Sequence, residues 1–265
     1  PAELLGQWGV PLSSAMKTAI DNLRLLDELQ FEHMPEGFWV AHARDGYESG
    51  RMATPDVFHR LNVSGDPVVI PAVRNGLLVA GSHDERALAA MASTAFDLME
   101  GNSWITFTPY VHDGDRWSRF EVPASHSAHA PLRKLECVEL REDYDGQRDL
   151  LLRVFGEDVF VPRLILSEND GRVKSFATWG EGVNALLPEA ESVVFSLLDP
   201  DDPEAYGEMF DVPFSAVLEV VGHRISRILE VEPHRWLTEG FPTEEELEQL
   251  RARSEDELSD STQHH

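Results

Sequence analysis

Residues 65–99, GDPVVIPAVRNGLLVAGSHDERALAAMASTAFDLM, contain the pattern that decides the fold. Two apolar runs, 68–73 and 77–80, lie on either side of the dipeptide Asn75-Gly76. Because asparagine and glycine both tolerate the positive φ of a type I′ turn, this arrangement predicts a tight β-hairpin. A hairpin alone is marginally stable in water, so we expect another element to pack against it.

The helix predicted directly after the hairpin supplies that element. Ser82 stands three residues before Glu85, which is the spacing of a capping box, in which each side chain hydrogen-bonds to the backbone amide of the other residue. Apolar residues then recur at helical spacing and form one stripe. The members of this stripe are Leu88, Met91, Ala92, Ala95, Phe96 and Met99.

Hairpins and helices alternate through the rest of the chain, which predicts an α+β protein with hairpin-rich antiparallel or mixed sheets covered by helices. The loop 123–131 separates two similar-sized halves, so we expect an N-terminal half at 1–123, a C-terminal half at 132–253 and a disordered tail at 254–265. Residues 144–155 are compatible with a helix or with two strands, and 212–221 with a helix or a helix plus a strand. The other helices that we expect are 13–29 (with Ala15, Ala19, Leu23 and Leu26 on one face), a short one starting at Thr54-Pro55, 180–187 and 244–252. The other strands that we expect are 38–43, 104–111, 116–122, 132–140, 159–166, 173–178, 192–197 and 224–231.

The composition suits a cytoplasmic protein with a sizeable core. Of the 265 residues 42% are hydrophobic, and no apolar stretch approaches the roughly 20 residues that cross a bilayer. The chain starts without the basic and apolar segments of a signal peptide. The single cysteine, Cys137, excludes an internal disulfide, and the neighbouring Glu136 and Glu139 disfavour a thiolate, so we expect it to be structural.

The charge balance is the most unusual property of the composition. The chain has 48 acidic residues against 22 basic ones, a formal net charge of −26. An electric field of this sign repels nucleic-acid phosphates and anionic membranes, so we expect neither as a partner. It attracts basic proteins, which suits a protein that docks or neutralises a basic partner. The alternative is that the charge only keeps the protein soluble.

Acidic residues also form a single-sign stretch between Lys174 and Arg224, where ten occur and no lysine or arginine does. Such a stretch predicts an acidic face. Aromatic residues interspersed with acids have the composition of a surface for a basic partner. The alternative is that the aromatic residues belong to the core and the acids coat the outside. The binding residues that we expect in this stretch are Tyr206, Glu208, Phe210 and Asp211.

No motif in the chain identifies a reaction. The sequence lacks the GxSxG of α/β-hydrolases and the phosphate-binding loops GxxxxGK[ST] and GxGxxG, so we expect no cofactor. We also expect no metal site. The nearest candidates are His126 and His129 in SHSAH, but Pro123 and Pro131 argue against the helix that their spacing requires, and a solvent-facing loop is the alternative.

Three stretches resemble the YtpQ-like family, a bacterial family of unknown function. They are WGVPLSSAMKTAIDNLRLL, DGYESGR at 45–51 and GDPVVIPAVRNGLLVAGS. They are similar to its Trp-Gly pair, its Ala-x-x-Asn-Leu helix, its Asp-Gly-Tyr-x-x-Ser/Gly-Arg segment and its Gly-Asp-x-Val-x-x-x-Pro strand. The family tends to carry Arg-Asp where this chain has Arg74-Asn75. The resemblance covers residues 8–99 and implies a bacterial cytoplasmic protein, without implying an activity.

In the half with this resemblance, the site residues that we expect are Asp45, Tyr47, Arg51 and Arg74. An arginine beside a turn can hold a carboxylate through two parallel hydrogen bonds. The alternative is structural, with Asp45–Arg51 or Asp66–Arg74 pairs that lock strand ends together.

These observations favour a non-enzymatic, acidic protein–protein interaction module, whose face at 189–219 docks or neutralises a basic partner. One alternative is a hydrolase-type enzyme with a site between the two halves, near SHSAH. The other is a structural subunit of a larger assembly.

Overall fold

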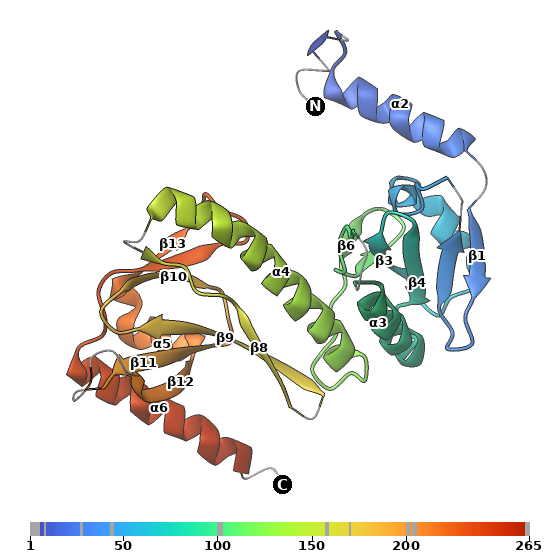
Figure 1. Ribbon diagram of the computed structural model, residues 1–265. Coiled ribbons are helices and arrows are strands. Elements are labelled where there is room, and N and C mark those ends of the chain that lie inside the picture. Colours follow the sequence, from blue (N-terminus) through green and yellow to red (C-terminus); the bar gives the residue numbers. More distant parts are fainter. Residues whose placement is uncertain are drawn as a thin grey trace. The chain divides into compact units, whose positions relative to one another are not determined.

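The computed structural model describes residues 6–7, 9–26, 29–42, 45–99, 103–156, 159–169, 171–199, 202 and 206–262. The chain forms two units, Pro1–Glu136 and Cys137–His265, and each is described by itself below (Figure 1). The boundary falls within helix α4 (His129–Phe155), after the predicted loop 123–131. Both units combine helices with antiparallel or mixed sheets, so the predicted α+β class is confirmed.

A six-stranded antiparallel sheet forms the centre of unit 1, in the order β1-β2-β4-β3-β5-β6. Every residue of β3 and β4 is buried, because side chains cover both faces of the sheet here. Burial on both faces explains why these two strands are continuous apolar runs. The strands are β1 (Gln30–His33), β2 (Trp39–His42), β3 (Pro67–Val73), β4 (Gly76–Gly81), β5 (Tyr110–His112) and β6 (Trp117–Arg119).

Helix α3 (Glu85–Met99) covers one face of this sheet (Figure 1). The predicted apolar stripe is confirmed: Ala87, Leu88, Met91, Ala92 and Ala95 are buried, and Phe96 and Met99 pack against the same core. The opposite face packs on Phe58, which belongs to η2 (Pro55–Arg60), the short helix predicted to start at Thr54-Pro55. A second short helix, η1 (Ser49–Ala53), precedes it.

The central hairpin is confirmed, but its turn comes one residue earlier than predicted. Val73 pairs with Gly76, so the two-residue loop is Arg74-Asn75 and Gly76 begins β4. The φ of Gly76 is not positive, and a Cβ at this position would lie 2.5 Å from Cγ2 of Val73. Glycine is therefore needed here for close packing of a neighbouring side chain, not for the conformation of the turn.

The predicted capping box is wrong. Helix α3 begins at Glu85, two residues later than a cap by Ser82 requires, and Oδ1 of Asp84 accepts the hydrogen bond from the amide of Ala87 at 3.0 Å. The hydroxyl oxygen of Ser82 instead accepts a hydrogen bond from the amide of Asp66 at 2.9 Å. Ser82 thereby joins the end of β4 to the residue before β3.

Helix α2 (Leu12–Leu25) corresponds to the first predicted helix, but none of its residues is buried. Of the four residues predicted to share one face, Ala15 and Leu23 are partly buried, whereas Ala19 and Leu26 are exposed. No helix among the described residues combines the length and apolar composition that a membrane crossing requires.

In its described residues, unit 2 forms two mixed four-stranded sheets, β13-β14-β10-β7 and β12-β11-β9-β8. β10 runs parallel to β7, and β11 runs parallel to β9. The strands are β7 (Val159–Phe160), β8 (Ile165–Asn169), β9 (Arg172–Gly180), β10 (Asn184–Pro188), β11 (Ser192–Leu198), β12 (Tyr206–Pro213), β13 (Ile225–Ile228) and β14 (Arg235–Thr238).

Helices pack on both sheets of unit 2. Helices α5 (Phe214–Val221) and α6 (Glu244–Thr262) bury Val217 and Leu250 in a core around Trp179 and Phe195. On the other sheet, Leu151 of α4 packs with Val161 and Leu186. Helix α6 continues past 252, through residues for which we expected disorder.

Three predicted elements differ from the structure. Residues 132–140, predicted as a strand, lie in α4, where Leu132, Leu135 and Cys137 are buried; the burial of Cys137 is as expected. Residues 180–187, predicted as a helix, form a turn with Gly182 at φ +81° followed by β10. The hairpin predicted at 104–122 is limited to β5 and β6. The predictions also missed β1, β12 and β14.

Candidate functional site

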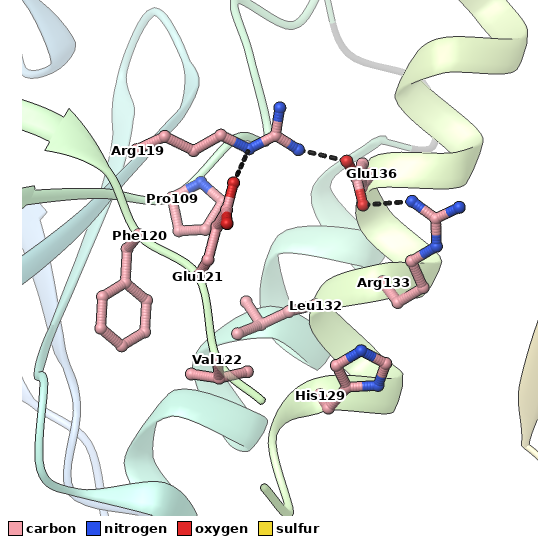
Figure 2. A pocket seen from close by; sticks show the side chains of 9 residues that line it. All are labelled: Pro109, Arg119, Phe120, Glu121, Val122, His129, Leu132, Arg133 and Glu136. Atoms are coloured by element: carbon pink, nitrogen blue, oxygen red, sulfur yellow. Dashed lines mark hydrogen bonds and ion pairs between the residues drawn. The ribbon is translucent and has the colours of Figure 1, made fainter. Parts of the chain in front are cut away.

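A pocket of about 370 Å³ lies in unit 1, where β6 and the residues after it face the first two turns of α4 (Figure 2). Its volume is in the range of small-molecule sites, about 300–1,000 Å³. All of its lining residues belong to unit 1. They are Pro109, Arg119, Phe120, Glu121, Val122, His129, Leu132, Arg133 and Glu136.

The apolar side of the pocket is part of the core. Leu132 is buried in the main core of unit 1, and Phe120 and Val122 pack against that core. The shape of this side is therefore fixed by the packing that folds the unit.

Four charged side chains of alternating sign form the polar side of the pocket (Figure 2). Arg119 donates from Nη2 to one oxygen of Glu136, and Arg133 donates from Nη1 to the other oxygen at 2.5 Å. Nε of Arg119 also lies 3.7 Å from Oε1 of Glu121. Glu136 thus holds both arginines, and the two positive and two negative charges balance.

The sequence contains a signal for this pocket that the predictions above do not use. Charged and apolar residues alternate from Arg119 to Val122, which places Arg119 and Glu121 on one side of an extended chain. Arg133 and Glu136 are three residues apart and face the same way only in a helix. We predicted a strand over 132–140, in which residues three positions apart point to opposite faces. That prediction therefore placed the side chains of Arg133 and Glu136 on opposite sides.

His126 and His129 contact different partners. Nδ1 of His126 accepts a hydrogen bond from the amide of Ala128 at 3.1 Å, whereas His129 lines the pocket as the first residue of α4. Pro131 is compatible with this helix because an amide in the first turn needs no acceptor within the helix. In the described residues, no group of three or more histidine, cysteine, aspartate or glutamate side chains is arranged to hold a metal ion.

The SHSAH segment is attached to α3 through Glu85. The hydroxyl of Ser127 donates to Oε2 of Glu85 at 2.7 Å, and Nε2 of His126 lies 4.0 Å from Oε1. The hydrogen bond from Ser127, and secondly the charge of His126, lower the pKa of Glu85. The hydroxyl of Ser127 points to a carboxylate here, whereas a nucleophilic serine donates to a base such as histidine.

The four site residues expected in the N-terminal half lie together in a structural lock. The Asp45–Arg51 ion pair that we considered as the structural alternative is present, with Nη2 of Arg51 2.5 Å from Oδ2 of Asp45. Oδ1 of Asp45 accepts a hydrogen bond from the amide of Tyr47 at 2.8 Å. Arg74 donates to the carbonyl of Gly46 at 2.9 Å and lies over the ring of Tyr47, so it does not pair with Asp66. These bonds fix the segment 45–51 against the turn of the central hairpin.

The residues expected on the acidic face lie on β12, and their charges are paired within unit 2. Glu208 accepts hydrogen bonds at 2.9 and 2.8 Å from Nε and Nη2 of Arg251, whose guanidinium also lies over the ring of Phe210. Asp211 pairs with Lys174 at 2.9 Å. The backbone of Tyr206 begins β12, and its side chain lies outside the described part. The single-sign stretch of the sequence is thus partly neutralised by cations from other elements.

The structure also brings together two histidines that the sequence analysis did not connect. Nε2 of His59 lies 2.7 Å from Nδ1 of His112, which is buried. The same Nδ1 atom accepts a hydrogen bond from the amide of Gly114 at 3.1 Å. Nδ1 of His112 is therefore an acceptor, and His59 carries the proton of the shared bond. These residues are 53 positions apart, so no local pattern indicates the pair.

Comparisons with protein-family models, curated proteins and solved structures found no match for this chain. The resemblance to the YtpQ-like family therefore stays a prediction from its motifs.

Proposed function

We propose that this chain is a non-enzymatic binding protein that docks a basic protein partner on unit 2. The observation that carries the proposal is the unequal distribution of charge. Residues 137–265 contain 30 acidic and 11 basic residues, an excess of 19, whereas residues 1–136 contain 18 and 11, an excess of seven. A surface with this excess raises the encounter rate with a basic protein.

Several basic side chains of unit 2 are engaged inside the unit, which supports the proposal. Arg235 is fully buried, Arg224 pairs with Glu246 at 3.1 Å, and Arg251 pairs with Glu208 and Glu244. By contrast, Glu245 and Glu248 in the first turns of α6, and Glu239 directly after β14, are exposed and make no ion pair with other described residues. Their carboxylates are therefore available to lysine or arginine side chains of a partner.

Strand β12 also exposes an apolar residue of unit 2. Met209 is 57% exposed between Glu208 and Asp211, and β12 is an edge strand of its sheet. Exposed apolar residues surrounded by polar ones are common at the centre of protein interfaces.

The test compares two variants of the full chain with equal net charge. One carries Glu239→Gln, Glu245→Gln and Glu248→Gln in unit 2. The control carries Glu36→Gln, Asp66→Asn and Asp115→Asn, which are exposed in unit 1. Wild-type protein first captures basic proteins from a lysate of the native host at low salt, and the affinity of the main captured protein is then measured against each variant.

We expect the unit 2 variant to bind about tenfold more weakly, at about 0.5 kcal/mol for each exposed carboxylate, and the unit 1 variant to bind as the wild type does. Binding should also weaken as salt rises. Equal effects of the two variants, or binding that is insensitive to salt, would contradict the proposal.

A further inference from the structure

We infer that the pocket of unit 1 binds a ligand with an apolar body that ends in a carboxylate. This inference concerns unit 1 alone and does not depend on the docking proposed for unit 2. Its ligand is either a small free acid or the carboxyl end of a peptide, which present the same chemistry to the pocket.

The apolar side of the pocket accounts for the body of the ligand. Phe120, Val122 and Leu132 offer a fixed hydrocarbon surface, and Pro109 extends it. Covering this surface with a hydrocarbon chain or ring removes apolar area from water on both sides. At about 370 Å³, the cavity takes a small molecule or the last residues of a peptide.

The ion pairs of the pocket account for the carboxylate. Glu121 is the least restrained of the four charged residues, because 78% of its side chain is exposed and it lies 3.7 Å from Arg119. Nη1 of Arg119 has no hydrogen-bond partner among the described residues. A ligand carboxylate can therefore replace Glu121 on Arg119, while Glu121 turns to solvent. Arginine holds carboxylates well because its donors match their geometry.

The charge balance of the pocket favours an anion over a cation. Without Glu121, the remaining group of Arg119, Arg133 and Glu136 carries one positive charge, which a monocarboxylate neutralises. Each oxygen of Glu136 already accepts a hydrogen bond from an arginine, so a cationic ligand would approach a carboxylate whose charge two guanidinium groups already offset.

The test measures binding of defined probes to the full chain by isothermal titration calorimetry. The first pair of probes is octanoate and 1-octanol, which share a hydrocarbon chain and differ in the carboxylate. The second pair is acetyl-Leu-Phe with a free carboxyl end and the same peptide with an amide end. We expect the acid of at least one pair to bind and its neutral counterpart to bind about tenfold more weakly or not at all. The acid that binds more tightly identifies the source of the ligand.

Three exposed substitutions then test the residues. Arg119→Gln should weaken binding of the acid about tenfold, because a charge-assisted hydrogen bond is lost. Glu121→Gln should strengthen it about twofold to threefold, since it removes a competing surface ion pair. Arg116→Gln, which changes the net charge as Arg119→Gln does but lies outside the pocket, should leave it unchanged. Circular dichroism verifies that each variant is folded.

Several outcomes would overturn the inference. They are equal binding of the acid and its neutral counterpart, equal effects of Arg119→Gln and Arg116→Gln, weaker binding in Glu121→Gln, and no binding of either acid. None of these outcomes bears on the docking proposed for unit 2, whose test uses residues of the other unit.

Discussion

The guanidinium of Arg51 lies 2.5 Å from the carboxylate of Asp45 and also donates from Nη1 to the carbonyl of Leu23 at 2.6 Å. Only 6% of the Arg51 side chain and 16% of that of Asp45 are exposed. One buried cation therefore joins three parts of unit 1: the turn at 45–47, η1 and helix α2.

Replacing Arg51 with alanine should lower the free energy of unfolding by about 3 kcal/mol, because the carboxylate of Asp45 is left buried without its cation. Loss of the bond to Leu23 should also accelerate hydrogen exchange of the amides in α2. The control is Arg60→Ala, which breaks the exposed pair with Asp56 and should cost about 0.5 kcal/mol or less. Urea unfolding and amide exchange measure both effects, and equal losses from the two substitutions would contradict the structural role of Arg51.

The substitution Gly76→Ala should lower the free energy of unfolding by about 2 kcal/mol, the usual cost of overpacking. The added methyl group would lie 2.5 Å from Cγ2 of Val73 in a fully buried hairpin. The matched substitution Gly146→Ala should have the opposite sign, a gain of about 0.5 kcal/mol, because Gly146 lies in α4 with no heavy atom within 4 Å of its added Cβ. Urea unfolding measures the free energy of unfolding of both variants. If Gly76→Ala raised this free energy, the turn would be able to shift and make room for the methyl group.

Long apolar patterns made much of unit 1 predictable. The stripe from Leu88 to Met99 spans three turns, and only a helix places all of its members on one face. The predictions failed where a short run fits two periods. The alternation over 135–140 suits a strand, but Leu132 and Leu135 are buried because they lie one helical turn apart in α4.

The interactions of the candidate sites depend on tertiary structure and are largely hidden from local patterns. Arg119 and Glu136 are 17 residues apart, and Arg251 and Glu208 are 43 apart. Whether an acidic stretch presents free carboxylates depends on cations from distant elements, which composition does not reveal. The Asp45–Arg51 pair could be anticipated because both residues belong to one short segment.

The substitution Asp143→Asn should stabilise the protein at pH 7. Burial, followed by the negative charges of Glu139 and Glu232, raises the pKa of Asp143. The folded state therefore holds this proton more tightly than the unfolded state does, so the ionised group costs stability at neutral pH, and the cost disappears as the pH falls through the folded-state pKa. We expect a gain of about 0.5 kcal/mol at pH 7, the size of a like-charge pair one helical turn apart.

Urea unfolding of the wild type and of Asp143→Asn at pH 7 and pH 4 measures this effect. The difference between the two proteins should be smaller at pH 4 than at pH 7, because the raised pKa makes Asp143 take up its proton in the folded state before it does so in the unfolded state. A difference that is equal at both pH values would show that the carboxylate charge is not its cause.

Arg235 is the buried cation on which the packing of α4 in unit 2 depends. It is fully buried and donates from Nε to Gln147 at 2.7 Å and from Nη2 to the carbonyl of Tyr144 at 3.0 Å, both in α4. From Nη1 it donates to the carbonyls of Leu186 and Pro162, at 2.9 and 3.1 Å. Burial lowers its pKa to about 10, so it remains charged at neutral pH.

Arg235→Lys should therefore lower the free energy of unfolding by about 3 kcal/mol, although it keeps the charge. A single ammonium group cannot reach acceptors on three separate segments, and each buried carbonyl left without a donor costs about 1–3 kcal/mol. The control is Arg227→Lys, at a partly exposed arginine 3.5 Å from Glu189, which should cost about 1 kcal/mol or less. Urea unfolding compares the two substitutions, and amide exchange should be faster in α4 of Arg235→Lys. If both substitutions lowered the free energy of unfolding equally, the hydrogen bonds from the Arg235 guanidinium to several segments would not be what holds α4 in place.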